Sequence, residues 1–131
     1  GIPVMGHIGL MPQTASNFKV KGKNNIEKKN IYKDAMAVSK SGAFAIIIEC
    51  VVESLVKKIT KNVSIPTIGI GASKHCDGQI LVTEDMLGLS DFSPKFVKRY
   101  SNLNNDIERC VKNYAKDVKM KRFPNYKNAY K

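Results

Sequence analysis

One stretch of almost unbroken apolar residues constrains the fold more than any other part of this 131-residue chain. It covers residues 43–50 and carries one charged side chain, Glu49, next to its end. Strands that are buried on both faces of a parallel sheet have continuous apolar sequences, and α/β barrel enzymes place catalytic groups at the carboxyl ends of such strands. We therefore expect an α/β fold with Glu49 as a candidate catalytic residue.

Three further apolar runs, at residues 2–10, 65–71 and 79–83, alternate with helical patterns at 31–38 and 52–59. Strand, helix and strand joined by such short connections form right-handed parallel crossovers. Gly42 is expected to end the first helix in a left-handed conformation. The sequence thus predicts a single domain over 1–131, with βα units in 1–92.

The region 93–123 is predicted to hold two closing helices, followed by a polar tail at 124–131. Ser93 and Pro94 have the character of a helix start, which would direct Phe96, Val97 and Tyr100 inward. A second helix is expected from about Asn105. Its apolar stripe, which includes residues from Ile107 to Val118, must pack against the body or a neighbouring subunit.

The net charge of +11 raises nucleic acid as a partner, but the residue types favour another explanation. Nineteen of the 22 basic residues are lysine, and they gather in 19–33 and 95–131. Specific phosphate and guanine recognition usually depends more on arginine. We expect solvated lysine-rich faces and no nucleic-acid partner, while an acidic small molecule or partner subunit stays open.

The sequence also bears on location. Apolar runs fall well short of the ~20 residues of a membrane span, and the first residues lack the pattern of a secretion signal. Cys50, Cys76 and Cys110 form no metal-site spacing and are expected to be reduced thiols. These features favour a cytoplasmic protein with no membrane partner.

Two residues near strand ends carry the candidate chemistry. Burial among apolar neighbours would raise the pKa of Glu49 toward the range of a general base, although it could also cap a loop or pair with a lysine. His7 lies between glycines that permit close approach of a ligand or a backbone. A substrate-binding role and a structural hydrogen-bonding role are both open for His7.

Other polar clusters give weaker signals. The glycine-rich stretch 69–73 could receive an anion on its amides, but it lacks the phosphate-loop lysine. His75, Cys76 and Asp77 are adjacent, and adjacent residues seldom converge on one metal ion. Asp77 and Gly78 look like turn residues, with Asp77 fixing the backbone and Gly78 relieving it.

Seven short motifs are spread over nearly the whole chain. They are PVMGHIGL at 3–10, PQ at 12–13, VKG at 20–22, ECV at 49–51, IPTIGIGA at 65–72, DGQ at 77–79 and PKF at 94–96. Taken together, and in this order, these motifs resemble the ketopantoate hydroxymethyltransferase family, which makes 2-dehydropantoate for pantothenate synthesis.

This resemblance implies the C-terminal half of a TIM (β/α)8 barrel, strands five to eight, plus C-terminal helices. The family transfers a hydroxymethyl group from 5,10-methylenetetrahydrofolate to 3-methyl-2-oxobutanoate with Mg2+. By motif, Glu49 is the catalytic base and His7 is substrate-binding. The metal ligands are expected in an N-terminal half that this chain lacks, and the family assembles as a homo-oligomer, a decamer.

One departure concerns the loop after Gln13, which is shorter than in the family, so closure over the substrate pocket is expected to differ. A second function class also stays open. A half barrel could be a non-catalytic remnant or interaction module that packs on another subunit. The resemblance favours the enzyme.

Overall fold

The computed structural model describes residues 1–12 and 19–130, so the loop after Gln13 lies largely outside the described residues. The chain divides into two compact units, Gly1–Leu81 and Val82–Lys131. Each unit is described by itself below. The expectation of a single domain over the whole chain stays a prediction.

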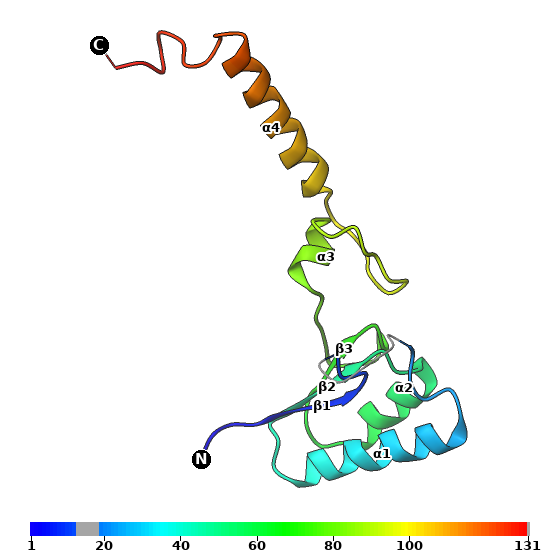
Figure 1. The fold of residues 1–131 in the computed structure, drawn as a ribbon. Helices are drawn as coiled ribbons and strands as arrows, with labels where there is room; N and C mark the ends of the chain where they lie inside the picture. Colours follow the sequence, from blue (N-terminus) through cyan, green and yellow to red (C-terminus); the bar gives the residue numbers. More distant parts are fainter. Residues whose placement is uncertain (13–18, 131) are drawn as a thin grey trace. The chain divides into compact units, whose positions relative to one another are not determined.

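The first unit is a parallel α/β sheet with its helices between successive strands, as the sequence predicts (Figure 1). Four strands lie in the order β1-β2-β3-β4, and every neighbouring pair is parallel. The elements are β1 (Met5–Gly9), α1 (Asn25–Lys40), β2 (Ala45–Glu49), α2 (Glu53–Asn62), β3 (Thr67–Ile70) and β4 (Gly78–Gln79). A parallel α/β architecture is therefore confirmed.

Helices α1 and α2 cover one face of this sheet (Figure 1). Because successive side chains of a strand alternate between faces, Ile46 and Ile48 of β2 enter the core, whereas Ile47 and Glu49 face the other side. The buried core consists of Ile8, Ile31, Ala35, Ile46, Ile48, Val51, Leu55, Val56 and Ile59. The opposite face of the sheet carries the candidate chemistry.

Both ends of α1 follow the sequence signals. Asn24 caps the start, with its Oδ1 accepting a hydrogen bond from the Glu27 amide at 2.8 Å. After the last helical turn, Gly42 has φ +84°, a left-handed conformation that glycine adopts without the steric cost of a side chain. The predicted stop at Gly42 is thus confirmed.

Asp77 ties the connection between β3 and β4 back to the start of β3. Its Oδ2 accepts hydrogen bonds from the Thr67 amide at 2.8 Å and from the Thr67 hydroxyl at 2.9 Å. These bonds to its charged form lower the pKa of Asp77. The predicted role of Asp77 in fixing the backbone is confirmed, whereas Gly78 needs no left-handed conformation and instead begins β4.

The lowered pKa of Asp77 predicts a pH-dependent contribution to stability. The folded pKa lies below the unfolded one, so this contribution is present above the ordinary carboxyl range and disappears as pH falls through the lowered pKa. Asp77→Asn should reduce the free energy of unfolding at pH 7 by about 1 kcal/mol and flatten its acid dependence. Urea unfolding at neutral and acidic pH measures both effects. Asp91→Asn, at an exposed position in the second unit, is the control, and identical pH profiles for Asp77→Asn and the parent would contradict this assignment.

The second unit contains α3 (Thr83–Leu87) and α4 (Leu103–Lys119). The prediction of a strand over 79–83 is wrong beyond Gln79, because Thr83 begins α3. Glu84 and Asp85 lie in the first turn of that helix, where acidic side chains favour a helical start. The second predicted closing helix is confirmed as α4, which begins two residues before Asn105.

The first predicted closing helix is wrong. Only a single turn forms after Ser93, with the Val97 amide donating to the Pro94 carbonyl at 2.9 Å. The chain does not continue as a helix because the Tyr100 amide donates to the carbonyl of Met86 in α3 at 2.8 Å. Tyr100 is 69% exposed, so it does not point inward as expected.

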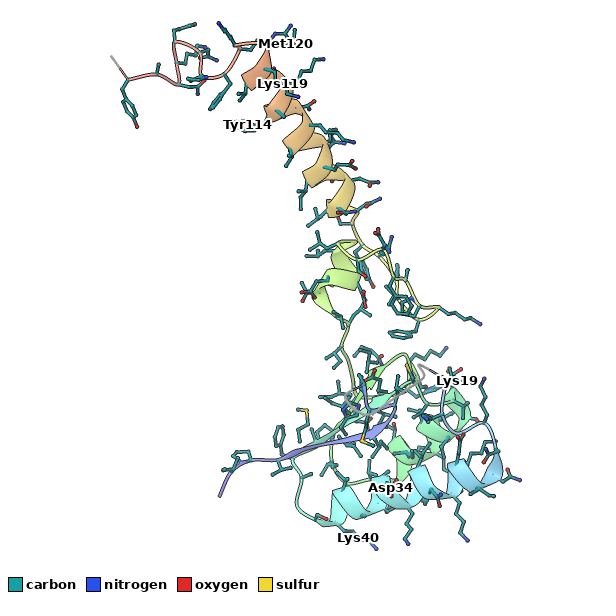
Figure 2. The ribbon with its side chains drawn as sticks, viewed as in Figure 1. Lys19, Asp34, Lys40, Tyr114, Lys119 and Met120 are labelled. Carbon is teal, nitrogen blue, oxygen red and sulfur yellow. The ribbon has the colours of Figure 1, made fainter. Side chains whose placement is uncertain are left out.

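The apolar stripe of α4 is exposed in the described residues. Ile107, Val111 and Val118 are each more than two-fifths exposed. Tyr114, labelled on this helix in Figure 2, packs edge-on against Phe123 with ring centroids 5.6 Å apart. Packing of the stripe between subunits stays a prediction.

Candidate functional site

Adjacent strands bring His7 and Glu49 together near the carboxyl end of the sheet. The register pairs His7 with Ile47 and Gly9 with Glu49. Both side chains project from the face opposite the helices, and Nε2 of His7 lies 3.2 Å from Oε2 of Glu49. The two residues that the sequence singled out independently therefore form one site.

The contact between His7 and Glu49 is electrostatic rather than a well-formed hydrogen bond. The side chain of Glu49 is 13% exposed and that of His7 is 30% exposed. Nε2 of His7 is fully buried and makes no hydrogen bond to the described residues. A buried ring nitrogen beside a carboxylate thus keeps an unused hydrogen-bonding position, which buried polar groups seldom do.

Burial sets the protonation behaviour of Glu49. Removal from water raises its pKa above the ordinary value, because desolvation penalises the ionised form. The nearby His7 acts in the opposite direction and lowers the same pKa. The net effect is a raised pKa, which confirms the shift expected from the apolar neighbours. The partner of Glu49 is a histidine, not the lysine that was the alternative.

Backbone hydrogen bonds from three segments hold the strand end that carries Glu49. The Leu10 amide donates to the Glu49 carbonyl at 2.9 Å, and the Cys50 amide donates to the Ile70 carbonyl at 2.9 Å. The Lys21 amide donates to the Cys50 carbonyl at 2.8 Å. Cys50 itself has φ +51°, an uncommon conformation for a residue with a side chain.

This set of backbone hydrogen bonds was not predictable from the sequence. A left-handed cysteine leaves no composition signal, and the contact with Lys21 joins segments about thirty residues apart. The only hint was Gly22, whose φ of +76° lets the chain turn beside β2. Its amide donates to the Glu27 carboxylate at 3.0 Å, which fixes the turn to the start of α1.

The remaining candidates have other roles. Asp77 accepts a hydrogen bond from the Thr67 amide, and the Ser73 hydroxyl accepts a hydrogen bond from the His75 amide at 3.1 Å. In residues 1–12 and 19–130, no group of three or more histidine, cysteine or acidic side chains is placed to hold a metal ion.

Magnesium does not fit the described site. Mg2+ requires near-octahedral oxygen coordination, whereas this site offers the single carboxylate of Glu49 beside an imidazole. The part of the chain that the structure describes therefore gives no basis for a metal-dependent step.

In the same described part, no helix is both long and apolar enough to cross a membrane.

Comparison with known proteins assigns the family. The model of the ketopantoate hydroxymethyltransferase family matches residues 1–126. A 3-methyl-2-oxobutanoate hydroxymethyltransferase of Pelagibacter ubique is 52% identical, over 98% of this chain and 50% of the relative. Enzymes with the same name from Phenylobacterium zucineum and Clostridium acetobutylicum are 54% and 52% identical, over 95% and 99% of this chain and 46% and 49% of their own lengths.

The chain therefore spans about half the length of the curated relatives it matches. The match nevertheless runs through both units, and it includes the strands that carry His7 and Glu49. By this match, the chain belongs to the ketopantoate hydroxymethyltransferase family of transferases.

Proposed function

We propose that this chain supplies the proton-abstracting part of an enzyme that transfers a hydroxymethyl group to 3-methyl-2-oxobutanoate. The observation that carries the proposal is the Glu49 carboxylate, only 13% exposed at the end of β2 and beside His7. Its raised pKa brings it closer to the range in which a carboxylate is an effective base near neutral pH. The relatives' shared name supplies the reaction class.

In the proposed reaction, Glu49 takes the proton from C3 of the keto acid. The electron pair of the broken C–H bond delocalises onto the C2 carbonyl oxygen and gives an enolate. C3 then forms a bond to the methylene carbon of 5,10-methylenetetrahydrofolate as one C–N bond of that carbon breaks and its electron pair returns to nitrogen. A water oxygen replaces the second nitrogen, the two nitrogens take up the proton from C3 and one proton from water, and tetrahydrofolate leaves, which gives the hydroxymethyl group of 2-dehydropantoate. The side chain of His7, 30% exposed beside Glu49, supports a role in binding the polar end of the substrate.

The chain spans about half the length of its relatives, so the proposal also covers the portion that they carry in addition. We assign the described sheet to strands five to eight of a TIM barrel. The portion that the relatives carry in addition would cover the open face of the sheet and supply the Mg2+ ligands. A cytoplasmic homo-oligomer, decameric as the resemblance implies, is part of the same proposal. We call this chain together with that portion the full-length form.

Exchange of the C3 hydrogen tests the central step. The full-length form should catalyse incorporation of deuterium from D2O into 3-methyl-2-oxobutanoate without the folate, because proton removal precedes transfer of the one-carbon unit. Glu49→Gln should stop this exchange. Exchange at an unchanged rate in that variant would remove Glu49 from the base role.

A separate prediction concerns His7 and the pH dependence of exchange. His7 lowers the pKa of Glu49, so in His7→Gln burial acts unopposed and the pKa of Glu49 should rise. The rate of exchange, which requires ionised Glu49, should then reach its plateau at a higher pH than in the parent. The pH profile of kcat/KM for exchange measures the shift. His75→Gln, at an exposed position before β4, is the control, and an unmoved profile in His7→Gln would contradict the pairing.

A further inference from the structure

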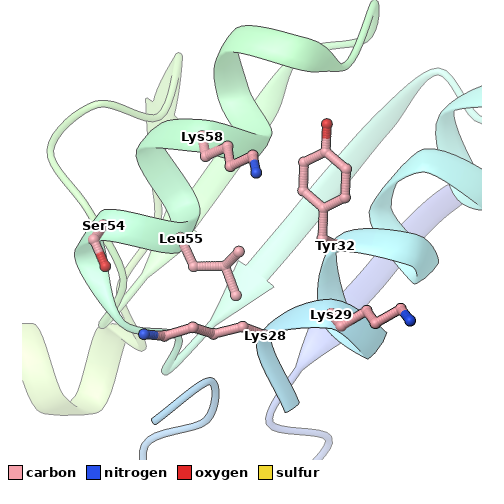
Figure 3. A pocket seen from close by; sticks show the side chains of 6 residues that line it. All are labelled: Lys28, Lys29, Tyr32, Ser54, Leu55 and Lys58. Atoms are coloured by element: carbon pink, nitrogen blue, oxygen red, sulfur yellow. The ribbon is translucent and has the colours of Figure 1, made fainter. Parts of the chain in front are cut away.

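A cavity of about 400 Å³ lies between α1 and α2, on the helix-covered side of the sheet (Figure 3). His7 and Glu49 project from the opposite face, so this cavity is separate from the proposed transferase site. Its lining combines basic, aromatic and apolar side chains from the two helices. They are Lys28, Lys29, Tyr32, Ser54, Leu55 and Lys58.

Helical spacing explains why these residues share one hollow. Lys28 and Tyr32 are four residues apart on α1, and Ser54 and Lys58 are four apart on α2, so each pair lies along one side of its helix. The floor is apolar because Leu55 is 6% exposed and belongs to the core. In Figure 3, Lys28 extends toward Ser54 and the amino group of Lys58 points toward Tyr32.

Within residues 1–12 and 19–130, the lysines of this cavity have no acidic partners. Among the described residues, no carboxylate lies within 4.0 Å of Lys28, Lys29 or Lys58. Lys58 instead places Nζ 5.0 Å from the centroid of the Tyr32 ring. The acidic residue nearest in sequence, Glu27, accepts hydrogen bonds from the backbone amides of Gly22 and Lys23.

Lys28 and Lys58 carry positive charge along the two sides of the hollow, and this charge attracts an anion; Lys29 also lines the hollow, but its amino group points away from it in Figure 3. A concave surface lined by one sign of charge, with low-dielectric walls, concentrates that potential. Lysine ammonium groups act as point charges toward phosphate. The cavity volume falls within the range of small-molecule sites, and its floor of Leu55 and Tyr32 provides apolar surface for an organic group.

We propose that the cavity between α1 and α2 binds a small molecule that carries a diphosphate group. Lys28 and Lys58 neutralise the diphosphate, Ser54 offers a hydroxyl, and any organic part of the ligand lies on Leu55 and Tyr32. A nucleic acid fits this site less well, because its backbone requires an extended basic track rather than one bounded hollow.

Calorimetric titration of the full 131-residue chain at low ionic strength tests this proposal, with inorganic pyrophosphate and ADP as the two probes. The triple variant Lys28→Ala, Lys29→Ala, Lys58→Ala should bind both probes at least tenfold more weakly than the parent. The matched control replaces Lys112, Lys116 and Lys119 of α4 with alanine and removes the same charge; it should change the affinity less than twofold. Circular dichroism establishes that both variants remain folded.

The two probes distinguish the source of affinity. Tighter binding of ADP than of pyrophosphate would support the proposal and assign the apolar floor to an organic group, whereas equal affinity would support a site that recognises the diphosphate alone. Equal weakening in both triple variants would reveal diffuse attraction to a basic chain and overturn the proposal. Absence of saturable binding of either probe to the parent would also overturn it.

Discussion

Glu49→Gln in the full-length form is expected to lower the rate of deuterium exchange at C3 of 3-methyl-2-oxobutanoate by about a thousandfold. General-base catalysis contributes roughly 10²- to 10⁴-fold, and glutamine has no basic oxygen of comparable strength. The amide occupies nearly the same volume as the carboxylate, so the site keeps its shape. The residual rate would then reflect substrate binding without a base.

The same substitution should leave the fold intact. The pKa of Glu49 is higher in the folded chain than in the unfolded one, so the folded state holds the proton more tightly. Stability therefore falls as pH rises through that raised pKa, and a neutral glutamine avoids this loss. Glu49→Gln should unfold at a urea concentration no lower than the parent at pH 7.

Glu53→Gln provides the control for this experiment, because Glu53 is an exposed residue in the first turn of α2. It should retain the parent rate of exchange. A rate in Glu49→Gln within twofold of the Glu53→Gln rate would rule out Glu49 as the base. Loss of exchange together with early unfolding would instead assign Glu49 a structural role.

Gly9→Ala is expected to destabilise the chain by about 3 kcal/mol, the largest stability effect of a single methyl group in this site. Gly9 ends β1 with φ +93°, a conformation that side chains rarely adopt. An added Cβ would lie too close to the Glu49 carbonyl oxygen for any ordinary contact and 2.6 Å from Cγ2 of Val51. Both neighbours belong to the strand end that positions Glu49, the proposed base.

Gly42→Ala separates the cost of the positive φ from the cost of the steric clash. Gly42 also has a positive φ, +84°, but an added Cβ there would meet nothing within 4 Å. It should cost only the conformational penalty, roughly 1 to 2 kcal/mol. Urea unfolding of both variants measures the difference. Equal destabilisation would show that close packing of Gly9 against Glu49 contributes nothing.

The sequence predicted most of the first unit because its signals were local and strong. The apolar run at 43–50 could only be a buried strand, and the helical spacing of the residues after it agreed with a crossover helix. The pairing of His7 with Glu49 was not predicted, although parallel strands place their carboxyl ends at the same edge of a sheet. Their separation of 3.2 Å depends on register, which periodicity alone does not fix.

Prediction failed where tertiary contacts decided the backbone. Ser93 and Pro94 have helix-starting character, yet the bond from Tyr100 to Met86 draws the chain away after one turn. The left-handed conformation of Cys50 was equally invisible, because it depends on hydrogen bonds from Lys21 and to Ile70. A composition rule cannot anticipate contacts between segments so distant in sequence.

The peptide groups at the end of β2 have a consequence for engineering this chain. The carbonyl of Glu49 is held by Leu10, directly after β1, and Cys50 is held by both β3 and the segment around Lys21. The backbone of Glu49 therefore has no independent position, because its hydrogen bonds are shared among three parts of the unit. A loop graft or shortened turn at Lys21 is expected to displace the proposed base, even though it replaces neither Glu49 nor His7.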